Sequence, residues 1–254
     1  MLINKIVSLR LKVSWIIWGA VMTYIIETIT SEWKEIIKRG VWALAVPILS
    51  IIYALLNTDR GWVNVIEVSI DRYIPFNKYF IVPYVLWYVY VGFFLMLLCI
   101  ISERSYRKLL MNLLIGALTC YGIFCVFPTT VPRPIINSQD IFSKIVLIIY
   151  NRDNPFNCFP SIHVLNAVLT AIYVNREPKL NRTVKFISTL IAVLIVLSTM
   201  FIKQHFFLDV VAATILSYSL YMIAYLIDDK KIIPLPRLNQ RLEQRIHLPY
   251  RHIE

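Results

Sequence analysis

Long apolar runs separated by short polar segments dominate the pattern of the chain. Six runs approach the length that a helix needs to cross a bilayer, roughly 17 to 25 residues. They are Val41 to Asn57, Tyr79 to Ile101, Leu109 to Phe127, Pro160 to Val174, Phe186 to Ile202 and Phe206 to Ile227. Backbone groups inside lipid must pair within their own segment, so these runs predict helices. The pattern predicts an all-α, polytopic membrane helix bundle with six transmembrane helices.

The two ends of the chain differ from this apolar part. Residues 13–26 are apolar or neutral and stop at Glu27, a length typical of a helix that lies along the membrane surface, although a seventh span is the alternative. The C-terminal tail is basic and contains prolines, which is typical of a solvated extension. We therefore expect an N-terminal interfacial arm (1–40), a six-helix membrane domain (41–227) and a basic tail (228–254).

Composition and charge agree with a membrane protein. Hydrophobic residues make up 58% of the chain and charged residues 16%, which excludes an ordinary soluble domain. The net charge is +11, but no pattern of a nucleic-acid groove appears, so no nucleic-acid partner is expected. The six-span model places nineteen of the 26 Lys and Arg residues on one side. This excess predicts a multi-pass protein of the cell membrane with a cytoplasmic tail.

Polar side chains that are able to bind phosphate or to catalyse a reaction gather at the ends of the spans. Arg133 lies in a proline-rich segment after the third span, where a guanidinium can bind phosphate through two N–H groups. Ser161 and His163 stand at the start of the fourth span, where unpaired amides and the helix dipole favour an anion. The structural alternatives are a snorkelling arginine and a capping turn.

His205 and Asp209 form a third group at the start of the sixth span. They are four residues apart, so on a helix they share one face, and the carboxylate can bind one imidazole nitrogen and leave the other as a nucleophile. A structural His–Asp pair is the alternative, but ionisable groups in a span usually serve function. Because alternate spans run in opposite directions, all three groups emerge on the extracytoplasmic face, where they can form one site.

These residues resemble the type 2 phosphatidic acid phosphatase superfamily, six-span enzymes that act on lipid phosphates and pyrophosphates. The family pattern is Lys, six residues, Arg-Pro; then Pro-Ser-Gly-His; then Ser-Arg, five residues, His, three residues and Asp. The matching residues are Arg133-Pro134, Pro160 to His163, Ser198, His205 and Asp209. The resemblance implies that His205 attacks phosphorus and that Asp209 orients it. It further implies that His163 protonates the leaving oxygen and that Arg133 and Ser161 hold phosphate oxygens.

Three positions depart from that pattern: Val126, Ile162 and Thr199 replace the family's Lys, Gly and Arg. A hydrogen bond to a charged group contributes roughly 1.5 to 3 kcal/mol, so two missing cations weaken the binding of a dianionic phosphate. We hypothesise that Lys203 supplies part of the missing charge, with a snorkelling lysine as the alternative. The candidate phosphate-binding residues are Arg133, Ser161, Ser198, Thr199 and Lys203.

The leading expectation is an integral membrane lipid phosphatase that acts at the outer face through a phosphohistidine and uses no metal or other cofactor. A lipid phosphotransferase is the second, because the Phe-Pro-Thr before Arg133 and the bulky Ile162 resemble the inositol phosphorylceramide synthase branch. A transporter or proton relay based on His205 and Asp209 is the third. No H-E-x-x-H spacing supports a zinc hydrolase. The expected partners are a lipid phosphate substrate and membrane lipids; the sequence indicates no oligomeric state.

Overall fold

The computed structural model describes residues 23, 25–59 and 61–229, and every structural statement below refers to these residues. Their regular structure is helical, with isolated β-bridges at Asn64–Thr129 and Thr130–Phe156. The α-helices are α2 (Ala45–Leu56), α3 (Ile81–Ile101), α4 (Glu103–Val126), α5 (Ile141–Arg152), α6 (Ile162–Arg176), α7 (Arg182–Phe201) and α8 (Phe207–Asp229). Short 3₁₀ helices cover Val41–Leu44, Ser69–Arg72 and Lys78–Phe80. The predicted all-α fold is confirmed.

Five helical segments are long and apolar enough to cross a membrane, which makes this a polytopic membrane protein. They are Ile25–Leu56, Lys78–Ile101, Glu103–Val126, Arg182–Phe201 and Phe207–Ile227. The first of them begins upstream of the predicted Val41, because helix continues from residue 25 through the 3₁₀ turn into α2. Most of the predicted interfacial stretch and residues 230–254 of the basic tail lie outside the described residues.

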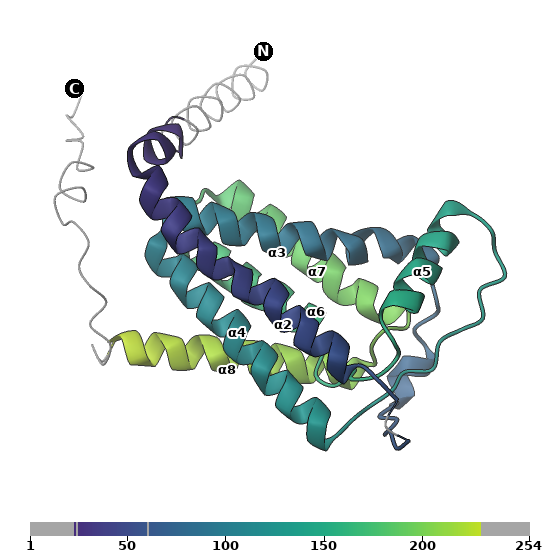
Figure 1. Cartoon of the computed structure of the whole chain (residues 1–254). Coiled ribbons are helices and arrows are strands. Elements are labelled where there is room, and N and C mark those ends of the chain that lie inside the picture. Colours follow the sequence, from purple (N-terminus) through teal and green to yellow (C-terminus); the bar gives the residue numbers. More distant parts are fainter. Residues whose placement is uncertain (1–22, 24, 60, 230–254) are drawn as a thin grey trace, which may run out of the picture.

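The predicted fourth span is α6, and its 15 residues are fewer than a bilayer needs. It contacts α3, α4, α7 and α8, so it lies inside the bundle, as Figure 1 shows. Eight of its side chains are buried. Polar groups among them pair across helices: Asn112 Nδ2 donates to Tyr173 Oη at 2.9 Å, and Ser217 Oγ donates to the Leu165 carbonyl at 3.3 Å.

The backbone of α4 approaches α6 at Gly116. A Cβ atom built there would lie 2.6 Å from Leu165 Cδ2 and 3.1 Å from Leu220 Cδ1, both shorter than the 3.5 to 4.0 Å of an ordinary carbon contact. The glycine therefore allows α4, α6 and α8 to pack at this distance. This contact fixes the position of α6 two residues after His163.

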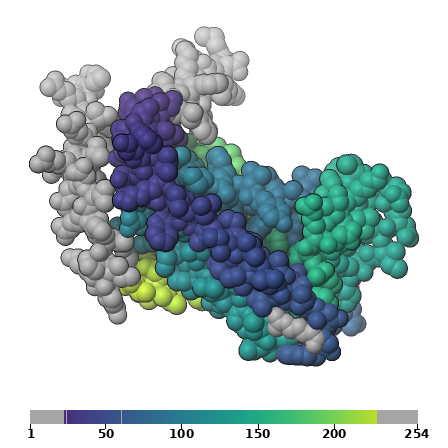
Figure 2. All heavy atoms as spheres, viewed as in Figure 1, coloured from purple at the N-terminus to yellow at the C-terminus, as the bar shows by residue number. Residues whose placement is uncertain are grey.

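The connections between helices are concentrated at one end of the bundle, which we call the loop end: residues 57–80, 127–161 and 202–206. Figure 1 shows α5 at this end, away from both termini, and Figure 2 shows α2 crossing the face of the molecule toward it. Asp140 caps α5 by accepting from the amides of Phe142 and Ser143. Lys78 Nζ lies 2.5 Å from Asp140 Oδ2, which ties α5 to the start of α3.

Candidate active site

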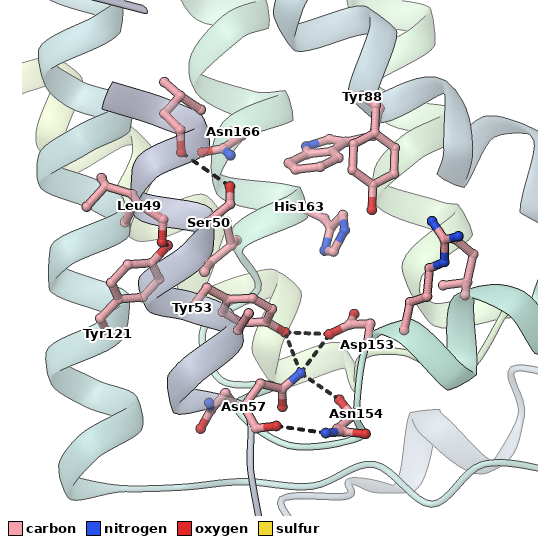
Figure 3. A pocket seen from close by; sticks show the side chains of 18 of the residues that line it. Leu49, Ser50, Tyr53, Asn57, Tyr88, Tyr121, Asp153, Asn154, His163 and Asn166 are labelled. Carbon is pink, nitrogen blue, oxygen red and sulfur yellow. Dashed lines mark hydrogen bonds between the residues drawn. The ribbon is translucent and has the colours of Figure 1, made fainter. Parts of the chain in front are cut away.

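A pocket of about 410 Å³ lies at the loop end, bounded by α2, α3, α4, α5 and α6. Its polar wall includes Tyr53, Asn57, Tyr88, Arg152, Asp153, Asn154, Asn157, His163, Asn166 and His205. Its apolar wall includes Val46, Leu49, Leu113, Leu114 and Ala117 from α2 and α4. Figure 3 shows side chains of both walls. A polar site that continues into an apolar space suits a molecule with a polar head and a hydrocarbon chain.

His205 is held from one side of its ring. Its Nδ1 lies 2.9 Å from the carbonyl oxygen of Cys158 and 3.3 Å from Asp209 Oδ2. A carbonyl oxygen only accepts hydrogen bonds, so Nδ1 carries a proton, and in the neutral imidazole Nε2 then keeps its lone pair. The sequence predicts that His205 and Asp209 share a helix face, but α8 begins at Phe207. His205 therefore lies in the turn before the helix, and Asp209 reaches back to it from the first helical turn.

The turn before α8 is fixed by several hydrogen bonds. The amides of Gln204 and His205 donate to the Thr199 carbonyl at 3.0 and 3.1 Å. Asp209 Oδ2 accepts from the Phe206 amide at 2.8 Å. Asp71, from the segment between α2 and α3, accepts from the Phe207 amide at 2.8 Å. The imidazole of His205 is thus presented by a rigid turn rather than by a helix.

His163 faces the same pocket from the first turn of α6. Its ring centroid lies 5.9 Å from that of His205, so both imidazoles can reach one small group placed between them. The rings of Tyr84 and Trp87, both on α3, lie 4.7 and 4.4 Å from the His163 ring. These contacts orient His163, and its place in the helix follows from the Ser161 cap.

Arg133 is bound to protein groups and does not line the pocket. Its Nη1 donates to the Tyr150 carbonyl at 2.7 Å, and its Nη2 donates to the Asp153 carbonyl at 2.5 Å and to Gln204 Oε1 at 2.8 Å. The guanidinium also lies 4.3 Å from the centroid of the Tyr150 ring. Its Nε is buried without a hydrogen-bond partner in the described structure. Gln204, to which Arg133 donates, is the residue immediately before His205 in the sequence.

The predicted serine and threonine ligands are engaged elsewhere. Ser161 Oγ accepts from the Val164 amide at 3.3 Å as the N-cap of α6. Ser198 Oγ donates to the Ile195 carbonyl at 2.6 Å, and Thr199 Oγ1 donates to a carbonyl of its own helix at 2.7 Å. All three residues are buried. They surround the turn that holds His205 but are not part of the pocket wall.

Lys203 is bound to backbone carbonyls and does not line the pocket. Its Nζ donates to the carbonyls of Asp71 and Ile74, at 3.2 and 2.5 Å. Its backbone has a φ of 53°, a left-handed conformation that is uncommon outside glycine. In this arrangement the lysine joins the turn before α8 to the segment between α2 and α3.

Three pocket residues were not predicted from the sequence. Asp153 follows α5, and its Oδ1 lies 2.8 Å from both Tyr53 Oη and Asn57 Nδ2 on α2. Burial raises the pKa of the Asp153 carboxyl, while the hydrogen bond from Tyr53 opposes this rise. About a hundred residues separate the partners, so no local motif could indicate the cluster.

The acidic and thiol groups do not gather in the way a metal centre requires. Within the described ranges, no three His, Cys, Asp or Glu side chains are grouped so that they could hold a metal ion. The four cysteines are free thiols, and Cys158 contributes its backbone carbonyl to the site.

The fold and the site define a helical membrane protein with paired imidazoles at the polar end of an apolar pocket. A model described as the PAP2 superfamily matches residues 54–223. The chain therefore belongs to the PAP2 superfamily, whose motifs it was found to resemble, and membership supports a phosphatase-type enzyme with a lipid phosphate as substrate.

The crystal structure of Aquifex aeolicus LpxE is similar with a TM-score of 0.45 and 18% sequence identity, covering 69% of this chain and 93% of that chain. No curated protein matches the sequence.

Proposed function

We propose that this protein hydrolyses a lipid phosphate or pyrophosphate at the extracytoplasmic face of the cell membrane, through a phosphohistidine on His205 and without a metal ion. The observation that carries the proposal is the contact of His205 Nδ1 with the Cys158 carbonyl and Asp209. In the neutral imidazole this contact leaves Nε2 unprotonated, which is the state a nucleophile needs.

In the first step, Nε2 of His205 attacks phosphorus and the bond from phosphorus to the leaving oxygen breaks. Asp209 compensates the positive charge that develops on the imidazole, as a buried carboxylate does in related constellations. His163 gives a proton to the leaving oxygen. The anionic phosphoryl group beside His163 favours the protonated imidazole that this step requires.

In the second step, water attacks the phosphohistidine and the bond between phosphorus and nitrogen breaks. His163 takes the proton from the water, and His205 returns to its initial state. Arg133, Ser161, Ser198, Thr199 and Lys203 are the proposed phosphate-binding set, and to bind phosphate each must exchange a present protein partner for a phosphate oxygen. For Arg133 this role requires the guanidinium to exchange at least one of its protein acceptors for a phosphate oxygen.

The apolar wall of the pocket supports a lipid rather than a soluble phosphate. Side chains of α2 and α4 extend the cavity away from the histidines, so a hydrocarbon chain can lie between these helices while the phosphoryl group stays at the loop end. The proposed outer location follows from the excess of Lys and Arg in the segments assigned to the other side.

The test uses purified full-length protein in lipid nanodiscs with a labelled lipid phosphate. We expect release of inorganic phosphate that persists in a chelator, and an acid-labile, base-stable label on the protein. His205→Ala should remove both, whereas His252→Ala, in the basic tail, should leave both unchanged. Normal turnover by His205→Ala would refute the mechanism, and loss of activity in the chelator would refute metal independence.

Transfer of the phosphoryl group to a lipid hydroxyl is the second candidate function. The observation in its favour is the phosphate cradle, in which Val126 and Thr199 stand where the family has cations. A cradle with less positive charge suits a singly charged phosphodiester better than a dianionic monoester. Label that moves into an added lipid alcohol would distinguish transfer from hydrolysis.

A further inference from the structure

A carboxylate lies in the proposed active site although no step of the mechanism uses it. Asp153 lines the pocket together with His163 and His205. Figure 3 shows its carboxylate between His163 and the two donors on α2, Tyr53 and Asn57. A negative charge at this place repels a phosphate group, so its presence beside phosphate chemistry needs an explanation.

The two oxygens of this carboxylate differ. Oδ1 accepts from Tyr53 Oη and Asn57 Nδ2, both at 2.8 Å, which fixes the orientation of the side chain. Oδ2 accepts no hydrogen bond from the residues that the structure describes. Arg133 donates to the backbone carbonyl of Asp153 and not to its carboxylate, so its positive charge acts on the carboxylate without a hydrogen bond.

The groups around Oδ2 form a recess with a defined hydrogen-bonding character. The Tyr88 hydroxyl lines the same pocket, points toward His163 and Asp153 in Figure 3, and has no partner among the described residues. Trp87 Nε1, beside His163, is a buried donor that also lacks a partner. The recess therefore offers a strong acceptor in Asp153 and a hydroxyl in Tyr88, in the same pocket as the imidazole of His163.

We propose that Asp153, held by Tyr53 and Asn57, binds an alcohol hydroxyl of the substrate next to the phosphoryl group and selects for substrates that carry one. This inference rests on the proposed phosphoryl chemistry at His205. A hydroxyl can donate to Asp153 Oδ2 and accept from Tyr88 at the same time, whereas a phosphate oxygen has no proton for the carboxylate. The phosphoryl group thus occupies the side of the histidines and Trp87, and the hydroxyl occupies the side of Asp153.

The hydroxyl has two possible sources with the same chemistry. It belongs either to the headgroup of a phosphodiester or to a lipid alcohol that replaces water in the second step. In the latter case the alcohol oxygen bonds to phosphorus, the bond from phosphorus to His205 breaks, and the alcohol proton passes to His163. Asp153 orients the hydroxyl in both cases and takes no proton.

The experiment compares matched lipids in the same preparation of full-length enzyme. The headgroup arm uses phosphatidylglycerol and phosphatidylpropanol, which carry one negative charge each and differ in the hydroxyls. The acceptor arm supplies a long-chain alcohol and compares transfer of the label to this alcohol with its transfer to water. We expect a preference on the order of tenfold in at least one arm, for phosphatidylglycerol in kcat/KM or for the alcohol over water in transfer. The arm that shows it identifies the source.

Asp153→Asn should bring that ratio close to one, whereas Asp59→Asn, an exposed aspartate at the same end, should preserve it. Tyr53→Phe keeps the carboxylate, loses one of its donors and should lower the ratio partly; it serves as the second variant should Asp153→Asn fold poorly. A merely structural role would lower the rates for both members equally and leave the ratio unchanged. A wild-type ratio near one in both arms, or a ratio unaffected by Asp153→Asn, overturns the proposal.

Failure of the proposed function gives a different result. In that case no lipid phosphate is turned over and no label appears on the protein. Binding then decides the inference separately, because Trp87 lines the pocket and its fluorescence can report lipid binding to His205→Ala. Equal affinity for both members of the lipid pair would refute the hydroxyl site, and a difference that Asp153→Asn removes would support it.

Discussion

Replacement of Gly116 by alanine tests the close packing of α4 against α6. The added Cβ would lie 2.6 Å from Leu165 Cδ2 and 3.1 Å from Leu220 Cδ1, against an ordinary contact of 3.5 to 4.0 Å. Leu165 is fully buried, so its methyl group cannot move without displacing other side chains. Overpacking of this kind costs about 1 to 3 kcal/mol, and the better helix propensity of alanine offsets about 0.8 to 1 kcal/mol of it.

The matched control is Gly122→Ala on the same helix, where an added Cβ meets nothing within 4 Å. It should gain the helix propensity without a steric penalty, so the two variants should differ by about 1 to 3 kcal/mol. With roughly 2 to 4 °C per kcal/mol for a chain near this size, the expected difference is several degrees. Thermal unfolding followed by tryptophan fluorescence, with both variants in the same detergent, measures it.

A second substitution checks that the contact itself is responsible. Leu165→Val removes the methyl group that the new Cβ would strike, so it should rescue part of the loss in Gly116→Ala. Neighbouring residues couple by about 0.5 to 3 kcal/mol in such cycles. Equal Tm values for Gly116→Ala and Gly122→Ala, or strictly additive effects in the double variant, would refute the packing argument.

Three further outcomes are expected. Asp209→Asn should keep residual phosphate release while His205→Ala keeps none, because the amide still accepts from the imidazole but no longer compensates its charge; equal, small losses in both would contradict these roles. Lys203→Ala should lower turnover and Lys203→Arg should restore part of it, whereas unchanged turnover in both variants would eliminate any role for this residue. The hydrogen bond from Lys78 holds the pKa of Asp140 below its ordinary value. The ionised carboxylate therefore stabilises the fold at any pH above the unfolded pKa of about 3.9. This contribution is lost as the pH falls through the lowered pKa of the folded state. Hydrogen exchange in the first turn of α5 should therefore be faster in Asp140→Asn than in wild type at pH 7, and the difference should shrink in acid; a constant difference would refute the assignment.

Much of the fold could be predicted because a membrane-spanning helix requires a long, apolar stretch of sequence, which is easily recognised. The predicted bounds of α3, α7 and α8 lie within four residues of the observed ones, whereas α4 begins six residues before the predicted Leu109. The start of the first helix was missed because charged residues after Glu27 interrupt the apolar run while the backbone stays helical. The short helix α5 was not predicted, since it lies in a connecting segment and is only 12 residues long.

The site was predictable only where its parts are close in sequence. The four-residue spacing of His205 and Asp209 indicated a contact, and their atoms lie 3.3 Å apart. The sequence pattern did not predict the directions of the side chains. A serine or threonine in a helix can donate to a backbone carbonyl of the same helix, as Ser198 Oγ does at 2.6 Å. Asp153 was missed because its partners come from α2, and loop residues give no periodic signal.

The turn that carries His205 depends on a distant stretch of the chain. Asp71 accepts from the Phe207 amide, and Lys203 Nζ donates to the Asp71 and Ile74 carbonyls. Because that stretch is a connecting loop at the end of the bundle, a water-soluble binder such as a nanobody against residues 64–74 is expected to loosen the turn that carries His205, the proposed nucleophile, without entering the lipid. An inhibitor of this protein therefore does not have to be a hydrophobic analogue of a lipid substrate.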